Sequence, residues 1–247
     1  MDLKIMTWNA RDWKNKKEEL CKRVHDYDIN IITETKNRDK DRFCISGYIT
    51  ITKNRRSGLI TGAGGVAMLI KKGIKFEEIK NIQVNSNNIE ALGVRIKGLD
   101  RAINLIGIYR KPGETEQPGV WKRLVESSGD IESLILTGDF NAHNRVWNCE
   151  QTDKNGEILM EELEEKNMFV VNSDTLTRIG EGGTRPSNLD LIFSSDRLFS
   201  LMKHKQGDDT WGSDHFPVSC EINVKKCPYR KLTNRISRKK TIGGTMK

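Results

Sequence analysis

Short apolar runs of strand length recur along this chain, and they constrain its fold more than any other feature. Examples are Leu3–Asn9, Asp28–Thr33, Gly65–Ile70 and the pair Ile89–Ile96 and Arg101–Tyr109, which has the pattern of a hairpin. Such runs bury apolar side chains only when the strands assemble into sheets. The sequence therefore predicts a β-rich core.

Three segments have helical spacing instead: Lys14–His25, Pro118–Ser127 and a segment from Asn155, as its expected N-cap, to Lys166. Hairpins alternate with strand–helix units, and the composition does not change before residue 224. We therefore expect one α/β domain over residues 1–224, with two mixed sheets face to face and helices outside. Residues 225–247 have few apolar residues and no periodicity, which predicts a flexible basic tail or linker.

The net charge of +8 suggests nucleic-acid binding at first sight, but it is unevenly placed. Nine of the 42 basic residues lie in 225–247, which holds no acidic residue, so residues 1–224 carry 33 basic and 34 acidic side chains. The body is nearly neutral, and the overall charge does not identify a substrate.

Several other classes of protein are disfavoured. No run approaches the ~18 apolar residues of a membrane span, so no membrane association is expected. The first residues show no secretory leader, and the five cysteines form no CxxC pair. We expect an intracellular protein with reduced thiols.

Polar residues stand where four of the predicted strands end. They are Trp8-Asn9, Thr33-Glu34, Gly138-Asp139-Phe140-Asn141 and Ser213-Asp214-His215. Each alone is readily explained as a turn or a surface residue. Together they supply carboxylate and amide oxygens, the ligands that Mg²⁺ prefers, and an imidazole beside a carboxylate. This set suits metal-assisted hydrolysis of a phosphodiester.

At these motifs the sequence resembles a known family. Trp8-Asn9, the strand end at Glu34, the segment 108–111 with Pro112, the GDFNAH run 138–143, the segment 188–191 and Gly212 to Pro217 are similar to motifs of the endonuclease/exonuclease/phosphatase superfamily. The GDFNAH run, followed by Trp147 and Asn155-Gly156, resembles the apurinic-endonuclease-like domain of non-LTR (LINE-type) retrotransposons. The resemblance covers residues 3–224.

The resemblance implies a four-layered α/β sandwich of the DNase I-like kind. It implies a Mg²⁺-dependent endonuclease, with Mn²⁺ as a substitute, that nicks one strand of double-stranded DNA and leaves a 3′-hydroxyl to prime reverse transcription. The implied partner is a linked or cooperating reverse transcriptase, the implied location is the nucleus, and the isolated domain is expected to be a monomer.

The resemblance also implies roles for single residues. The metal site is expected to comprise Glu34, Asn9 and Asp214. Asp139 would orient or deprotonate the attacking water with help from Asn141. Tyr109 would contact the scissile phosphate. His215 would bind a phosphoryl oxygen or act as an acid or base, with Asp190 fixing its tautomer.

Basic and polar loop residues near these motifs could follow the DNA backbone, where phosphate contacts dominate affinity. The expected DNA-binding residues are Arg110, Lys111, Arg145, Arg185 and Ser187. The sequence departs from the family here, because one proline follows the arginine where the branch usually has two. A structural role is expected for His143.

Two alternative functions remain open. The same catalytic set could serve an abasic-site repair nuclease or another phosphoesterase. A decayed copy could instead be a non-catalytic module that binds DNA through its basic tail.

Overall fold

The computed structural model describes residues 2–38, 41–55, 63–180, 182–183, 185–225 and 227, and the statements below concern these residues. The strands are β1 Leu3–Asn9, β2 Ile29–Thr33, β3 Tyr48–Lys53, β4 Val66–Lys71, β5 Lys75–Glu78, β6 Ile89–Lys97, β7 Ile103–Arg110, β8 Leu134–Asp139, β9 Met168–Val170, β10 Asp190–Ser195, β11 Met202–Gln206 and β12 Val218–Ile222. The helices are α1 Lys17–Arg23, α2 Val120–Ser127, α3 Lys154–Glu164 and α4 Asp196–Phe199, with 3₁₀ turns η1 Trp13–Lys16, η2 Val24–Asp26, η3 Ile131–Ser133 and η4 Arg145–Trp147.

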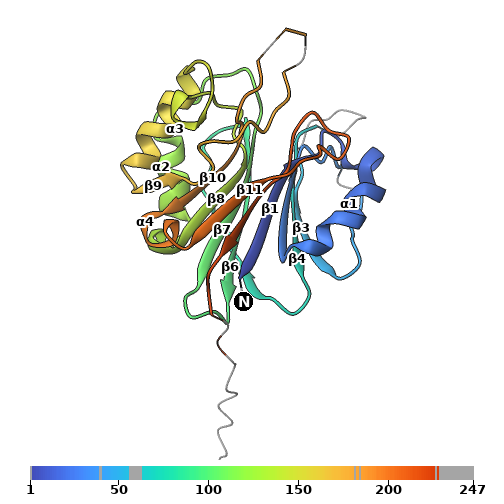
Figure 1. Cartoon of the computed structure of the whole chain (residues 1–247). Coiled ribbons are helices and arrows are strands. Elements are labelled where there is room, and N and C mark those ends of the chain that lie inside the picture. Colours follow the sequence, from blue (N-terminus) through green and yellow to red (C-terminus); the bar gives the residue numbers. More distant parts are fainter. Residues whose placement is uncertain are drawn as a thin grey trace, which may run out of the picture.

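The strands of the described chain form two six-stranded mixed sheets that face each other. One sheet has the order β11-β12-β1-β2-β4-β3 and the other β5-β6-β7-β8-β10-β9. Helix α1 lies outside the first sheet, and α2, α3 and α4 lie outside the second (Figure 1). The predicted four-layered α/β sandwich is confirmed.

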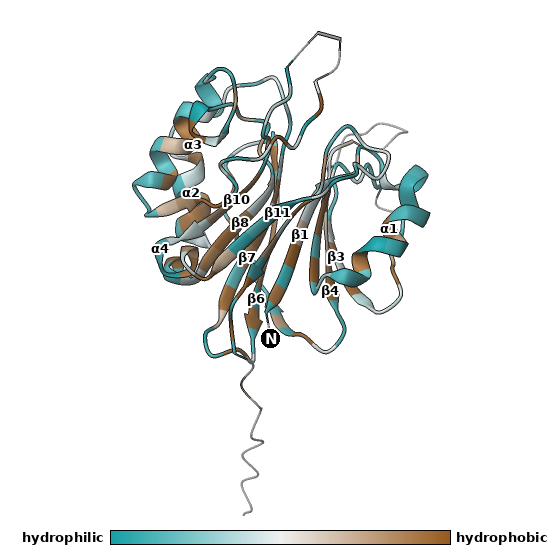
Figure 2. Ribbon diagram, viewed as in Figure 1, coloured by the Kyte–Doolittle hydropathy of each residue, from teal (hydrophilic) through white to brown (hydrophobic). Residues whose placement is uncertain are grey.

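Alternation along the strands explains this arrangement. In β7, Ile103 and Leu105 belong to the core between the sheets, whereas Ile106 and Ile108 pack under the helices of the second sheet. Successive side chains of a strand point to opposite faces, so a strand that is apolar at every position is buried on both. Figure 2 shows the result: apolar residues line the strands and the inner faces of the helices, and polar residues cover the outside.

The helix layer corrects two readings of the sequence. The N-cap of α3 is Asp153, whose carboxylate accepts from the amide of Gly156 at 2.7 Å, and not Asn155. The acidic residues of α3 look like one solvated face in the sequence. Glu162 is buried instead, and its carboxylate accepts from the amides of Trp121 at 2.8 Å and Lys122 at 3.0 Å, and from that of Gly119.

The C-terminal part also differs from the prediction. The segment 198–204, expected to be one strand, comprises the end of α4, a turn and the start of β11. The predicted tail lies outside the described residues apart from Lys225 and Cys227, whose backbone groups bond the turn at Gly98 and Asp100. No helix in the described part of the chain is long and apolar enough to cross a membrane.

Candidate active site

The inward faces of five strands change from apolar to polar at the same end of the sandwich. Asp139 at the end of β8 is paired in register with Asp190 at the start of β10 and with Tyr109 near the end of β7. In the other sheet, Asn9 at the end of β1 is in register with Thr33 of β2, which precedes Glu34. Every second residue of a strand faces inward, so the residues that follow the core residues on the inward face bring these side chains together at one end of the sandwich.

Asn9 joins the two sheets at this point. Its amide nitrogen donates to Glu34 Oε1 at 3.1 Å and to Asp139 Oδ2 at 2.7 Å. Its carbonyl oxygen accepts from the backbone amide of Arg11 at 2.9 Å, which fixes the orientation of the amide. Asn9 therefore turns a donor, not a ligand oxygen, toward the carboxylates. Asn9 was expected to be a metal ligand. In the structure it orients the carboxylates of Glu34 and Asp139.

The loop after β8 holds Asp139 from the other side. The backbone amide of Asn141 donates to Asp139 Oδ1 at 3.0 Å, and its side-chain nitrogen donates to Asp139 Oδ2 at 3.0 Å and to the carbonyl of Arg110 at 2.7 Å. Asn141 adopts a left-handed backbone with φ 45°, which asparagine tolerates well. A side chain at Gly138 would collide with the backbone of Ile108 on β7, which explains the glycine before Asp139.

Arg110 is placed differently from its prediction. Its side chain is fully buried, donates to the carbonyl of Asn141 at 2.9 Å and to that of Glu114, and lies 3.3 Å from the carboxylate of Glu116. A guanidinium enclosed in this way does not reach a DNA phosphate, so the predicted DNA contact is wrong. Arg110 instead clamps the loop that positions Asp139.

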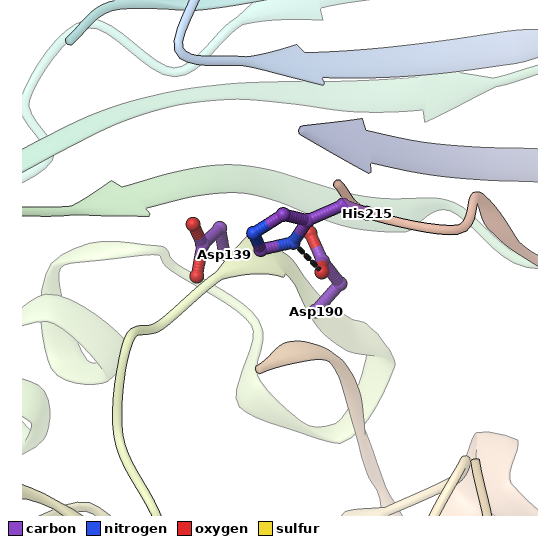
Figure 3. Close-up of side chains that lie close together, drawn as sticks. All are labelled: Asp139, Asp190 and His215. Carbon is purple, nitrogen blue, oxygen red and sulfur yellow. Dashed lines mark hydrogen bonds and ion pairs between the residues drawn. The ribbon is translucent and has the colours of Figure 1, made fainter. Parts of the chain in front are cut away.

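His215 lies between Asp139 and Asp190, and its Nδ1 is 2.5 Å from Asp190 Oδ2 (Figure 3). Because this bond to Asp190 raises the pKa of His215, Nδ1 is the donor and carries the proton. Burial alone would lower the pKa of His215, but the charge and hydrogen bond of Asp190 outweigh it and raise the pKa to about 9. The ring is therefore cationic near neutral pH. The oxygen of Thr177 accepts from the amide of Asp190 at 3.0 Å and keeps this strand end in place.

Negative charge is crowded around Asp139. Its carboxyl is fully buried, and burial together with the charges of Asp190 and Glu34 raises its pKa to about 8. Tyr109 donates its hydroxyl to Glu34 Oε1 at 3.1 Å, and burial, followed by the charges of Glu34 and Asp139, raises its pKa. Burial and the neighbouring carboxylates thus favour the neutral form of both groups.

The residues present fit a hard divalent cation. Glu34 is half-buried and lines a cleft, and its Oε1 and Asp139 Oδ2 share the same amide donor from Asn9. Carboxylate oxygens of this kind suit Mg²⁺ or Mn²⁺, whose charge would relieve the crowding. Asp139, Asp190 and His215 also present ligand atoms within 4.8 Å of one another. However, a cation held by those three would have to break the short bond between His215 and Asp190. We therefore favour the side of Glu34 and Asp139.

Asp214 is occupied by neighbouring cations. Its Oδ2 accepts from Arg11 Nη1 at 2.8 Å and lies 3.8 Å from Arg178 Nε. Asp214 was expected at the edge of the metal site. In the structure it belongs to an ion-pair network that lines the cleft.

The remaining predicted DNA contacts divide by exposure. Lys111, Arg145 and Arg185 are exposed, and Arg185 pairs with Glu150 at 2.8 Å. Ser187 is buried, and its backbone pairs with that of Arg178, so its expected DNA contact does not fit.

One neighbouring acidic residue was not predicted from the sequence. Glu90 of β6 is buried, pairs with Arg55, and has a pKa raised by burial. Arg55 also lies over the ring of Tyr109, 5.9 Å from its centroid. The nearest sequence signal was that Glu90 interrupts an apolar strand.

The candidate active site opens onto a cleft of about 450 Å³. Its lining includes Glu34, Asn141, Asp214 and His215 at one end and the start of α3 at the other.

Comparisons with known proteins agree with this geometry. The model of the family described as "Endonuclease-reverse transcriptase" matches residues 103–219, from β7 to β12. The RNA-directed DNA polymerase from mobile element jockey of Drosophila melanogaster is 28% identical over 161 residues, which cover 64% of this chain. The match spans only 17% of that protein's length.

Two solved structures share the fold. The endonuclease domain of TRAS1, a telomere-specific non-LTR retrotransposon, is 20% identical with a TM-score of 0.68, covering 90% of this chain and 98% of the domain. An AP endonuclease from Archaeoglobus fulgidus is 15% identical with a TM-score of 0.68, covering 90% of this chain and 100% of that one. At these identities the likeness concerns the fold alone.

The motifs, the family model over residues 103–219 and the shared architecture agree: the chain is similar to the endonuclease part of non-LTR retrotransposon proteins.

Proposed function

We propose that the chain nicks one strand of double-stranded DNA with Mg²⁺ as its cofactor and leaves a 3′-hydroxyl. The observation that carries this proposal is that Asn9 bonds both Asp139 and Glu34, that the His215–Asp190 pair lies beside Asp139, and that Glu34 and His215 line one cleft. A general base, a fixed cation and an acidic metal site are the groups that phosphodiester hydrolysis needs.

Asp139 is the proposed base. The oxygen of a water molecule bonds to phosphorus while the bond from phosphorus to the 3′-oxygen breaks, and a proton of the water passes to the carboxylate. The departing 3′-oxygen takes up a proton and becomes the hydroxyl end, and the phosphate stays on the 5′ side. Asn9 and Asn141 hold the carboxylate with three hydrogen bonds, so its geometry is set before substrate arrives.

The other groups stabilise the charges of the scissile phosphate and of Asp139. A bound divalent cation supplies positive charge to the scissile phosphate and favours the ionised form of Asp139. Glu34 and Asp139 would hold it. His215, cationic through Asp190, is suited to donate from Nε2 to a phosphoryl oxygen. The Tyr109 hydroxyl orients Glu34 and stands where it could reach the same phosphate.

A second candidate is cleavage at abasic sites, favoured by the shared fold with an AP endonuclease. The chemistry would be the same and only the DNA recognised would differ. The jockey relative is an RNA-directed DNA polymerase, so we propose that the hydroxyl made here primes reverse transcription by a linked or cooperating polymerase. Action on chromosomal DNA would place the protein in the nucleus, which localisation of the tagged protein would test.

The central prediction concerns nicking itself. Mg²⁺ is expected to convert supercoiled plasmid to the open circle, EDTA to prevent this, and Asp139→Asn to lower the single-turnover rate about 10³-fold because the base is lost. The exposed Asp196→Asn is the control and should cleave normally. Extension of the mapped nicks by a polymerase reports the 3′-hydroxyl. Equal nicking rates for Asp139→Asn and the unaltered protein would contradict the role of Asp139, and no Mg²⁺-dependent nicking by the unaltered protein would mean a non-catalytic module. Strong preference for an abasic duplex would favour the repair reaction.

A second prediction separates two adjacent basic residues. Arg110→Met should lower the cleavage rate at saturating DNA about 10–100-fold, because Asn141 and hence Asp139 are displaced, with little change in DNA affinity. Lys111→Met removes an exposed charge and should weaken binding with little effect on the rate. Anisotropy titrations and single-turnover assays on both variants check this, and a loss of affinity confined to Arg110→Met would contradict the assignment.

A third prediction concerns pH in the metal-free protein. The pKa of His215 is raised from 6.5 to about 9, so its contribution to stability is complete below pH 6.5 and is lost as pH rises through 9. The raised pKa of Asp139 acts in the same direction from about pH 4 to 8. Urea unfolding in EDTA should show stability falling from pH 6.5 to 9, with His215 contributing on the order of 2 kcal/mol. His215→Gln should flatten this part of the curve, whereas the exposed His25→Gln should leave it unchanged.

A fourth prediction concerns the tail. Residues 228–247 include seven of the nine basic residues that follow position 224. We propose that they tether DNA without sequence preference or serve nuclear import. Their removal should weaken DNA affinity and reduce its salt dependence while the rate at saturating DNA stays unchanged. A chain that lost its chemistry on truncation would refute this division.

A further inference from the structure

The active-site cleft continues beyond the catalytic residues. Besides Asn141, its lining includes Thr115, His143, and Asp153 and Lys154 at the start of α3. The reaction proposed above uses none of these four residues. A DNA strand carries one phosphate charge per ~3.4 Å of helix axis, so a cleft that receives the scissile phosphate also receives its neighbours.

His143 is held firmly at this end. Its Nδ1 lies 2.8 Å from Asp153 Oδ2, and its carbonyl accepts from the amide of Asp153 at 3.0 Å. Asp153 is itself fixed by capping α3 through Gly156. A side chain at position 156 would collide with the carbonyl of His143, so the glycine lets the loop lie directly against the helix. The imidazole is therefore anchored by both side chain and backbone.

The chemistry of this pair points to an anion. Burial works against the charge of Asp153, but the hydrogen bond from His143 and the Gly156 amide lower its pKa, so it is a carboxylate that accepts from Nδ1. Nε2 has no partner among the described residues, and His143 keeps a side chain 40% exposed on the cleft.

The other cations along this wall already have carboxylate partners. Arg11 and Arg178 share Asp214, and Lys154 pairs with Glu157 at 2.9 Å. His143 is held through Nδ1, so its second ring nitrogen, Nε2, is left to meet a ligand in the cleft. It repeats the design of His215 with Asp190, at a position that flanks the reacting centre.

We propose that His143, oriented by Asp153, binds a phosphate of the nicked strand next to the scissile phosphate. This inference rests on the proposed function, because it takes DNA to be the occupant of the cleft. His143 thus positions the strand and contributes to affinity, while the bond-breaking step remains with Asp139 and His215. The structural role expected for His143 from sequence is extended to substrate binding.

Binding measurements test this site directly. DNA affinity is measured by anisotropy in EDTA over a range of NaCl concentrations for the full chain and for His143→Gln. We expect the dissociation constant to rise about 3–10-fold and the slope of log K against log salt to shrink by about 0.9, the value for one lost phosphate contact. His143→Lys should restore the slope. The single-turnover rate at saturating DNA should stay within about threefold for both variants.

A second measurement leaves the protein unaltered. Methylphosphonate groups, which carry no charge, are placed one at a time beside the nick. The unaltered protein should lose affinity at one flanking position, and His143→Gln should show no further loss at that position.

The matched control is His204→Gln. His204 forms a similar pair with Asp174 at 2.7 Å but does not line the cleft, so its salt slope should equal that of the unaltered chain.

Each outcome bears on the proposal. An unchanged slope in His143→Gln, a slowed rate at unchanged affinity, or additive losses with every methylphosphonate would overturn it. If the unaltered chain neither binds nor nicks DNA, the proposed function fails and the site fails with it. If it nicks normally and only the His143 predictions fail, the proposed function stands alone.

Discussion

The face-to-face packing of two sheets is the constraint on which the rest of the molecule depends. Apolar side chains fill the space between the sheets over most of its length, from Leu3 and Ile5 to Leu105 and Ile135. Toward one end the same inward columns present Asn9, Asp139 and Asp190. A polar group is stable at such depth only when its hydrogen bonds are met, and Asn9 meets part of this need for carboxylates from both sheets.

This arrangement explains why the site is strongly perturbed and still well ordered. Asp139 is enclosed completely, yet its two oxygens receive hydrogen bonds from Asn9 and Asn141. The cost of crowding several acids is offset locally by His215. Asp190 Oδ1 has no hydrogen-bond partner among the described residues. This buried acceptor and the carboxylates of Glu34 and Asp139 suit a ligand that carries positive charge.

Much of the fold and the site was accessible from the sequence, because both depend on period-two alternation and on residues at strand ends. Asn9, Glu34, Asp139 and His215 were found in this way, and Asp190 was found through the family resemblance. The failures share a physical cause, which is burial of charge. Arg110 and Lys111 are indistinguishable in the sequence, yet Glu116, several residues further on, encloses one of them and leaves the other exposed.

The other differences from the prediction arise from tertiary contacts, which local sequence patterns do not specify. Asp153 and Asn155 are both good N-caps, and only the approach of the His143 loop to Gly156 decides between them. Arg55 and Glu90 become neighbours of Tyr109 through sheet register, which local patterns do not specify. Short elements such as α4 are decided by tertiary packing, because four residues carry little propensity.

The buried Glu162 joins the two outer helices. Helix α2 begins at a glycine and has no side-chain cap of its own, and the acceptor for its first amides comes from the last turn of α3. Asp153, which caps the other end of α3, also anchors His143. A change that loosens α3 is therefore expected to reach both the first turn of α2 and this wall of the cleft.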